Sequence, residues 1–158
     1  MRPAVLNASP VIILARAGFV DLLPKLLSPI VMPRAVSDEI QAGLVDDPAR
    51  RFLAQRPRWM SIVEVAPALS PLASWRLGPG ESEVLEYART HRGTVAVLDD
   101  KPARRAARTL QLPLTGTLGL LIAAVHSGFL PSLPEALKAA KDSGLYVSPG
   151  TMADLTER

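Results

Sequence analysis

The sequence has 158 residues, 48% of them hydrophobic and 21% charged, which is the composition of a soluble globular protein about one domain long. No cysteine is present, so disulfide scaffolds, thiolate metal sites and cysteine catalysis are excluded. The formal net charge is +3 and most basic residues are arginine, a side chain that suits contacts with phosphate.

The N-terminal apolar residues are interrupted by polar ones such as Asn7 and Arg16, so the sequence predicts neither an export signal nor a membrane span. We therefore expect a cytoplasmic protein with one domain over residues 1–158. In the first half of the chain, short strands should alternate with short helices. Residues 4–6 form a buried strand, Ser9 is the N-cap of a helix at 11–17, and Gly18 ends that helix. The next elements are expected to be a helix at 19–27, a strand at 30–32, helices at 33–42 and 47–55, and a strand at 60–65.

Residues 66–80 are rich in proline and form the least regular segment. After it, the sequence predicts a helix at 81–90, a strand at 95–98, a helix at 102–110, a strand at 112–114 and a helix at 117–126. Ser132 and Glu135 have the spacing of a capping box for a helix that ends near Gly144. An edge strand at 146–147 and a short helix in the tail complete the chain. Such alternation favours an α/β fold with a short, mainly parallel sheet flanked by helices.

Three pairs of acidic residues lie at the edges of these elements: Asp38 and Glu39, Glu81 and Glu83, and Asp99 and Asp100. In parallel sheets, ligands bind beyond the carboxyl ends of the strands, where Asn7 and Asp99 are expected. Carboxylates that converge repel one another, and a fold tolerates this when a cation neutralises them. Oxygen ligands without cysteine or paired histidines suit Mg²⁺ or Mn²⁺. Such a cation can activate water and stabilise the transition state of phosphodiester cleavage.

Four segments in this order resemble the PIN-domain family, which includes many toxin ribonucleases of bacterial toxin–antitoxin pairs. They are 5–10 (VLNASP), 33–40 (PRAVSDEI), 78–83 (GPGESE) and 97–104 (VLDDKPAR). The segment 116–121 (GTLGLL) also resembles one branch of that family. The resemblance extends from residue 4 to about residue 147. It implies a three-layer PIN-like fold and a metal-dependent endoribonuclease that acts as the toxin of such a pair.

Position by position, the resemblance implies that Glu39, Glu81 and Asp99 are the catalytic acids and hold Mg²⁺ or Mn²⁺. Asp100 is a further metal ligand, and Ser9 matches a small hydroxyl that helps to order the site. Asn7 stands where the family has an acid, so this ligand position carries a neutral amide. The resemblance also implies an RNA substrate, a homodimer and a small antitoxin with a segment that covers the site.

Each of these residues also has a structural interpretation. Glu39 could be a solvated surface charge, and Glu81 could complement a helix dipole. Asp99 and Asp100 could cap the helix at 102, while Asn7 and Ser9 could form a turn and an N-cap. The isolated His91 and His126 and the apolar helix at 117–126 favour packing roles.

A basic face next to the proposed site consists of Lys101, Arg104, Arg105 and Arg108. It could contact RNA phosphates, or it could be an ordinary solvated helix face. Two other functions stay open. Asn7 favours a PIN-like binding or regulatory protein without catalysis. The glycine-rich turn at 78–81 favours a nucleotide-binding domain, although it lacks the Gly-Lys-Ser/Thr ending of a phosphate loop.

Overall fold

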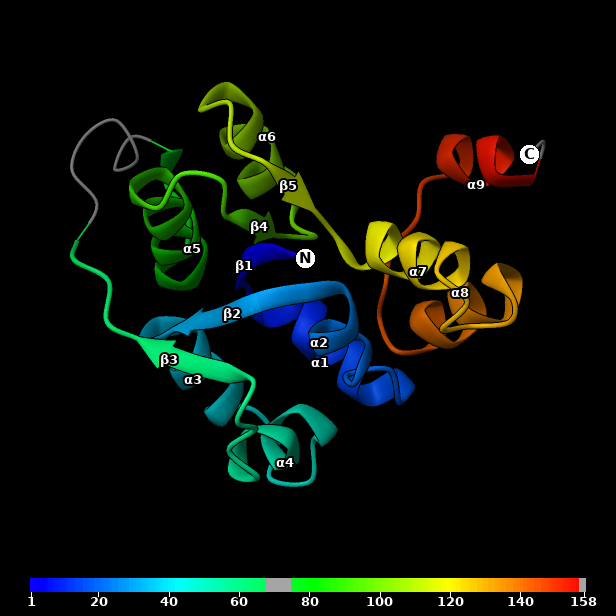
Figure 1. Ribbon diagram of the computed structural model, residues 1–158, viewed down its shortest axis with the longest axis horizontal. Coiled ribbons are helices and arrows are strands. Elements are labelled where there is room, and N and C mark those ends of the chain that lie inside the picture. The colour runs from blue at the N-terminus through cyan, green and yellow to red at the C-terminus, as the bar shows by residue number, and fades with distance from the viewer. Residues whose placement is uncertain (68–74, 157–158) are drawn as a thin grey trace.

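The computed structural model describes residues 1–67 and 75–156 (Figure 1). The part of the irregular segment around Pro71 lies outside these residues. Five strands form one sheet in the order β3-β2-β1-β4-β5, and every neighbouring pair is parallel. Their bounds are β1 Arg2–Leu6, β2 Leu27–Pro33, β3 Met60–Val63, β4 Val95–Val97 and β5 Leu114–Thr115. The predicted α/β fold with a parallel sheet flanked by helices is confirmed.

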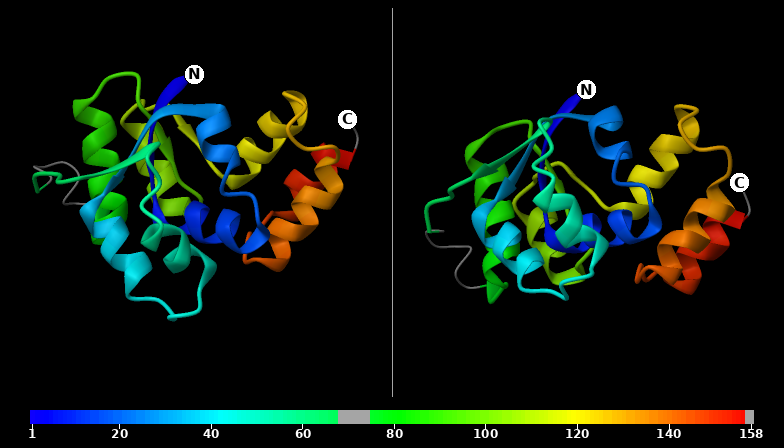
Figure 2. Two further views of the ribbon diagram at one scale, coloured as in Figure 1. Left: turned by 60° about the horizontal axis from the view of Figure 1, so that its bottom comes forward. Right: turned by 90° about the horizontal axis from the view of Figure 1, so that it is seen from below.

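The helices connect successive strands and extend the chain beyond β5. Their bounds are α1 Ala8–Ala17, α2 Leu22–Leu26, α3 Arg34–Gln41, α4 Pro48–Ala54, α5 Pro79–Thr90, α6 Lys101–Thr109, α7 Thr117–His126, α8 Leu133–Asp142 and α9 Pro149–Thr156. In Figures 1 and 2, α7, α8 and α9 lie together at the right-hand side of the molecule. Within residues 1–67 and 75–156, every helix is too short or too polar to cross a lipid bilayer.

The centre of the sheet is buried on both faces. Ala4, Val5 and Leu6 of β1 are at most 1% exposed, and all three residues of β4 are buried. Continuous apolar runs of this kind are typical of parallel strands covered by helices. The backbone N–H of Asn7 donates to the carbonyl oxygen of Val97 at 3.1 Å. The residues that follow β1 and β4 therefore leave the sheet at the same edge.

Two elements near the N-terminus differ from the sequence-based prediction. The N-cap of α1 is Asn7 rather than Ser9, because Asn7 has the extended backbone of a cap (φ −88°, ψ 167°) and the helix already begins at Ala8. The helix expected at 19–27 is shortened to α2. Leu27 instead pairs with Arg2 and begins β2.

The predicted edge strand at 146–147 is wrong, whereas the predicted tail helix is confirmed as α9. The segment between α8 and α9 has no strand pairing. It places the Tyr146 ring 5.4 Å from the Lys101 ammonium of α6, and Tyr146 remains 70% exposed. Leu145 is buried and its N–H donates to the carbonyl oxygen of Ala140 at 2.9 Å, so the chain is anchored to the end of α8 and passes α6 without pairing to the sheet. The Ser132 cap is confirmed, since its hydroxyl accepts the Glu135 N–H at 3.4 Å.

Candidate active site

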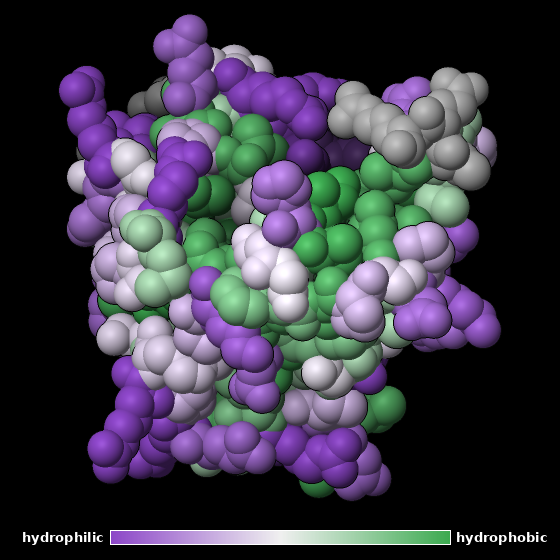
Figure 3. Space-filling view, turned by 45° about the vertical axis from the view of Figure 1, so that its right-hand side comes forward, coloured by the Kyte–Doolittle hydropathy of each residue, from purple (hydrophilic) through white to green (hydrophobic). Residues whose placement is uncertain are grey.

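A cleft of about 870 Å³ opens where the chain leaves the carboxyl ends of β1 and β4. All of the site residues proposed from the sequence line it: Asn7, Ser9, Glu39, Glu81, Asp99, Asp100, Lys101, Arg104, Arg105 and Arg108. Its other walls come from β5, α7 and the segment that leads into α9. Figure 3 turns the side that carries α7 to α9 forward, and it shows hydrophobic surface in the middle of this face with hydrophilic side chains around much of its margin.

Asn7 and Glu39 converge on the backbone of Gly80. A Cβ atom at Gly80 would lie 2.9 Å from Glu39 Oε2 and 3.5 Å from Asn7 Oδ1, and 3.3 Å from Val36 Cγ2. Glycine at this position lets the Glu39 carboxylate lie against the first turn of α5, and a larger residue would displace it. Asn7 is 2% exposed, and its Oδ1 has no hydrogen-bond partner within the described part of the chain. A buried unsatisfied oxygen of this kind costs about 1–3 kcal/mol, so it calls for a ligand.

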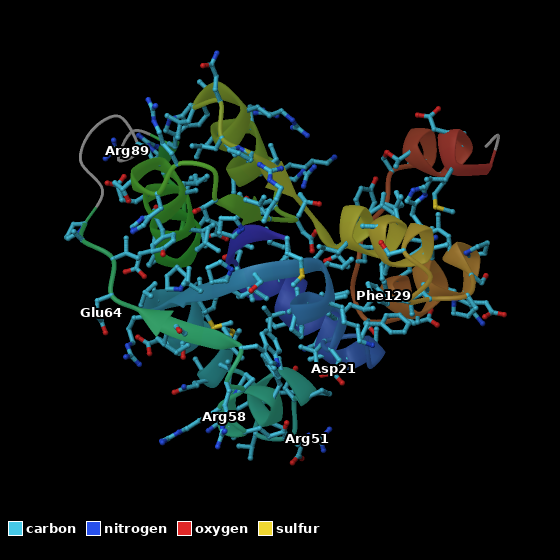
Figure 4. All side chains as sticks on the ribbon, viewed as in Figure 1. Asp21, Arg51, Arg58, Glu64, Arg89 and Phe129 are labelled. Atoms are coloured by element: carbon cyan, nitrogen blue, oxygen red, sulfur yellow. The ribbon has the colours of Figure 1, made fainter. Side chains whose placement is uncertain are left out.

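Glu39 and Glu81 interact through their charges. Glu39 is exposed at the surface, but the protein around it removes part of its hydration. This partial desolvation raises the pKa of Glu39 above the ordinary glutamate value, and the negative charge of Glu81 raises it further. Neither carboxylate is paired with a cationic side chain in residues 1–67 and 75–156. Other acids differ in this respect. Glu64 pairs with Arg34 at 2.9 Å and Glu86 with Arg89 at 2.7 Å, and Figure 4 shows Glu64 and Arg89 at the margin opposite α7 to α9.

Asp99 is held by the first residue of α7. Its Oδ1 accepts the backbone N–H of Thr117 at 2.7 Å, and its Oδ2 accepts the Thr117 hydroxyl at 2.6 Å. The N-cap residue, Gly116, has no side chain to cap this helix. A negative charge is favourable at a helix N-terminus, so Asp99 stabilises the start of α7. Asp99 does not cap the helix at 102, which was one interpretation of the sequence.

Asp100 performs that capping role instead. It is the N-cap of α6, and its Oδ2 accepts the backbone N–H of Ala103 at 3.0 Å. Ser9 lies half-buried in the first turn of α1 and faces the cleft. Both Ser9 and Asp100 line the cleft. Asp100 is exposed, and one of its carboxylate oxygens already accepts the N–H of Ala103.

The acids do not form a cluster of three. Within the described ranges, no group of three or more His, Cys, Asp or Glu residues is placed to hold a metal ion. Glu39 and Glu81 form an interacting pair next to Asn7, while Asp99 is bound separately to Thr117. The oxygens of Asn7, Glu39 and Glu81 fit Mg²⁺ or Mn²⁺, because a hard cation would satisfy the Asn7 oxygen and neutralise the two carboxylates.

The basic wall of the cleft comes from α6. Lys101, Arg105 and Arg108 are exposed, whereas Arg104 is partly buried and donates from Nη1 to the carbonyl oxygen of Leu98 at 2.7 Å. Burial lowers the pKa of Arg104, the neighbouring Arg108 lowers it further, and Asp99 opposes both. Together, these four cationic side chains give the cleft a positive wall.

The glycine-rich turn at 78–81 does not form a phosphate-binding loop. The Glu81 carboxylate turns back toward the helix start, and its Oε2 lies 2.6 Å from the position of a Cβ atom at Gly78. A negative charge therefore stands where a phosphate would bind to the helix N-terminus.

The sequence-based prediction missed two residues of this site. Thr117 was assigned to packing, and Gly80 was considered only as part of a turn. The available signal for Thr117 was its position three residues after the predicted strand at 112–114, near the edge where ligands bind in parallel sheets.

A family model described as a PIN domain (DUF3368) matches residues 3–158. No curated protein matches the chain significantly. The family match covers every residue of the cleft.

Proposed function

The chain belongs to the PIN-domain family, and on this premise we propose that it is a Mg²⁺- or Mn²⁺-dependent endoribonuclease. PIN domains are generally nucleases, so a nuclease-type function follows from the family alone. The metal dependence, the RNA substrate and the roles of individual residues are our proposal. The observation that carries the proposal is the buried Asn7 oxygen, which has no hydrogen-bond partner among the described residues. The Glu39 carboxylate lies near it, so one cation could contact both.

Asn7, Glu39 and Glu81 would hold the cation, and Asp99 and Asp100, which line the same cleft, would join them as further oxygen ligands once the cation is bound. When bound, a divalent cation supplies Lewis-acid activation of water and neutralises the charge that develops on the phosphodiester. Ser9 would help to order the first turn of α1 in the cleft. The protein's own residues would thus place a phosphodiester between the acidic residues of the cleft and the basic side chains of α6.

Lys101, Arg105 and Arg108 would attract the RNA backbone through their exposed charges. Arg104 would contribute charge, but its Nη1 is committed to Leu98. Because phosphate contacts of this kind carry no sequence information, the basic wall would bind RNA without choosing a sequence.

We also propose that the protein acts in the cytoplasm as the toxin of a toxin–antitoxin pair, as a homodimer, with a small antitoxin segment covering the cleft. The resemblance of its motifs to such toxins supports this role. Expression of the chain should arrest growth, and co-expression of a small protein encoded next to it should relieve the arrest. Growth that is unaffected by an active nuclease would contradict the toxin role without contradicting the nuclease.

A second candidate is a PIN-like binding or regulatory protein without catalysis, and Asn7 favours it. An amide in place of a carboxylate removes one negative charge from the ligand set and so weakens the attraction for a cation. Such a protein would bind RNA through α6 and leave it intact.

Incubation of RNA with the purified protein tests the proposal, with Mn²⁺, Mg²⁺ or EDTA in parallel reactions. Glu81→Gln, purified in the same way, controls for contaminating ribonuclease. We expect cleavage by the wild type with either metal, none with EDTA, and a loss of at least tenfold in Glu81→Gln. Equal cleavage by both proteins would contradict the proposal, and RNA binding without cleavage would establish the second candidate.

A further inference from the structure

We propose that Thr117 is a positioning residue, which fixes the carboxylate of Asp99 in one orientation on the wall of the cleft. The inference rests on the proposed function, in which Asp99 helps to hold the cation. It concerns a side chain that neither the family match nor the motif pattern assigns to the site.

The contact between the two residues involves both carboxylate oxygens. Thr117 donates its N–H to Oδ1 at 2.7 Å and its hydroxyl to Oδ2 at 2.6 Å. Hydrogen bonds to an ionised acceptor are short and about twice as strong as those between neutral groups. Two donors from one residue fix the rotation of the carboxylate, which a single bond would leave free. Each oxygen keeps further acceptor capacity for a ligand in the cleft.

The surroundings of Thr117 are rigid. Thr117 is completely buried, and it begins α7 with Gly116 as the only residue between this helix and β5. The N–H of Leu98 donates to the carbonyl oxygen of Thr115 at 2.9 Å, which ties the chain before Asp99 to the chain before Thr117. We call the two hydrogen bonds from Thr117 to Asp99 the clamp. Its donor, Thr117, and its acceptor, Asp99, therefore follow two segments that are hydrogen-bonded to each other.

Gly116 lets these segments approach closely. A Cβ atom at this position would stand 2.7 Å from Asp99 Oδ1, 2.8 Å from Arg104 Nη1 and 2.9 Å from the Leu98 carbonyl oxygen. The Arg104 guanidinium is bonded to that same carbonyl oxygen, and the charge of Asp99 acts on it. The Asp99 carboxylate is thus held in one orientation before any ligand enters the cleft, so little reorganisation is needed when one binds.

A simpler role for the same contact is that Asp99 caps α7 and does nothing else. The two roles predict different losses when the hydroxyl is removed. A cap contributes to the stability of the fold, whereas a positioning residue contributes to metal affinity and turnover per folded molecule. Partners of this kind around metal ligands typically change affinity or activity by about 10–100-fold.

Thr117→Val tests the proposal, because valine keeps the shape and the backbone N–H but removes the hydroxyl. Thr117→Ser keeps the hydroxyl, and Thr94→Val is the matched control. Thr94 is also buried but lies at the amino end of β4, away from the cleft. Mn²⁺ affinity is measured by titration calorimetry, cleavage as kcat and KM with an RNA substrate, and stability by urea unfolding.

We expect Thr117→Val to lose about tenfold or more in Mn²⁺ affinity and in kcat, with KM for RNA changed less than about threefold. Thr117→Ser should recover most of both losses, and Thr94→Val should match the wild type in both. A Thr117→Val protein that binds Mn²⁺ and cleaves RNA like the wild type would overturn the proposal, whatever its stability. So would a Thr117→Ser protein as impaired as Thr117→Val, because the loss would then come from packing.

The calorimetry separates this inference from the function on which it rests. A wild type that binds Mn²⁺ without cleaving RNA contradicts the nuclease, and the comparison of Mn²⁺ affinities still decides the role of Thr117. A wild type that binds no Mn²⁺ overturns both.

Discussion

Glu83 of α5 accepts a hydrogen bond from the backbone N–H of Ala35, in the first turn of α3, at 3.0 Å. The N-cap of α3 is Pro33, which offers no side-chain acceptor, so Glu83 satisfies a donor that the helix itself leaves free. The bond links the two helices that carry Glu39 and Glu81. The acidic pair of the cleft is therefore aligned by a third acid that takes no part in it.

Replacement of Glu83 should weaken this alignment. We expect Glu83→Ala to lower the free energy of unfolding by about 0.5–2 kcal/mol, the usual loss for a helix cap. Glu83→Gln keeps an acceptor oxygen and should lose less. Urea unfolding measures both. A Glu83→Ala protein as stable as the wild type would show that the bond does not tie α3 to α5.

Gly80→Ala should damage metal binding without damaging the fold. The added methyl group would meet Glu39 Oε2 at 2.9 Å and Val36 Cγ2 at 3.3 Å, so the Glu39 carboxylate must move. Alanine is the better helix former by up to about 1 kcal/mol, which offsets the strain. Gly150→Ala is the matched control, because Gly150 also follows the proline that begins a helix and has nothing within 4 Å of the new methyl group.

Calorimetry of the two glycine variants should therefore show a weaker Mn²⁺ affinity in Gly80→Ala alone. If both variants bind Mn²⁺ like the wild type, Glu39 is not a ligand at its observed position.

The raised pKa of Glu39 predicts the pH dependence of the metal-free protein. The folded state holds the proton of Glu39 more tightly than the unfolded state does, so this residue's contribution to stability falls as the pH rises from about 4 through the raised pKa. Glu39→Gln removes the titrating charge. At pH values above the raised pKa, the unfolding free energy of Glu39→Gln should exceed that of the wild type. The fall in stability that the wild type shows across this pH range should be absent from Glu39→Gln.

Thermal or urea unfolding in EDTA across pH 4 to 8 measures this difference. Asp38→Asn, the exposed neighbour on the same helix, is the control for removal of a surface charge. A wild type and a Glu39→Gln protein with parallel pH profiles would show that Glu39 is an ordinary solvated side chain.

The sequence predicts the strands and helices well because local signals mark them. Buried apolar runs identify β1 and β4, and residues such as Asp47 and Ser132 cap helices where their spacing indicates. The clamp on Asp99 could not be predicted in this way. Its partner is 18 residues away, and only the pairing of β4 with β5 brings the two together. The segment at 146–147 has the composition of a strand, but the preceding Leu145 is bonded to Ala140 at the end of α8, and local composition does not reveal such an anchor.

Asn7→Asp should change metal-free stability and metal affinity in opposite directions. The new carboxylate would be buried next to Glu39, so the metal-free variant should unfold more easily than the wild type. The added charge should also strengthen Mn²⁺ binding by about tenfold, or about 1.4 kcal/mol. Without Mn²⁺, the unfolding free energy of Asn7→Asp should therefore be lower than that of the wild type. The increase in unfolding free energy on addition of Mn²⁺ should be larger in Asn7→Asp.

The dependence of RNA cleavage on Mn²⁺ concentration, measured for the wild type and Asn7→Asp with Glu81→Gln as the baseline, tests the central claim most directly. If Asn7 and the acids around it hold a catalytic cation, Asn7→Asp reaches half of its maximal rate at about tenfold lower Mn²⁺ than the wild type, and Glu81→Gln stays near background. Identical Mn²⁺ dependence of the wild type and Asn7→Asp, or cleavage that persists in EDTA, would contradict a metal-dependent nuclease at this cleft.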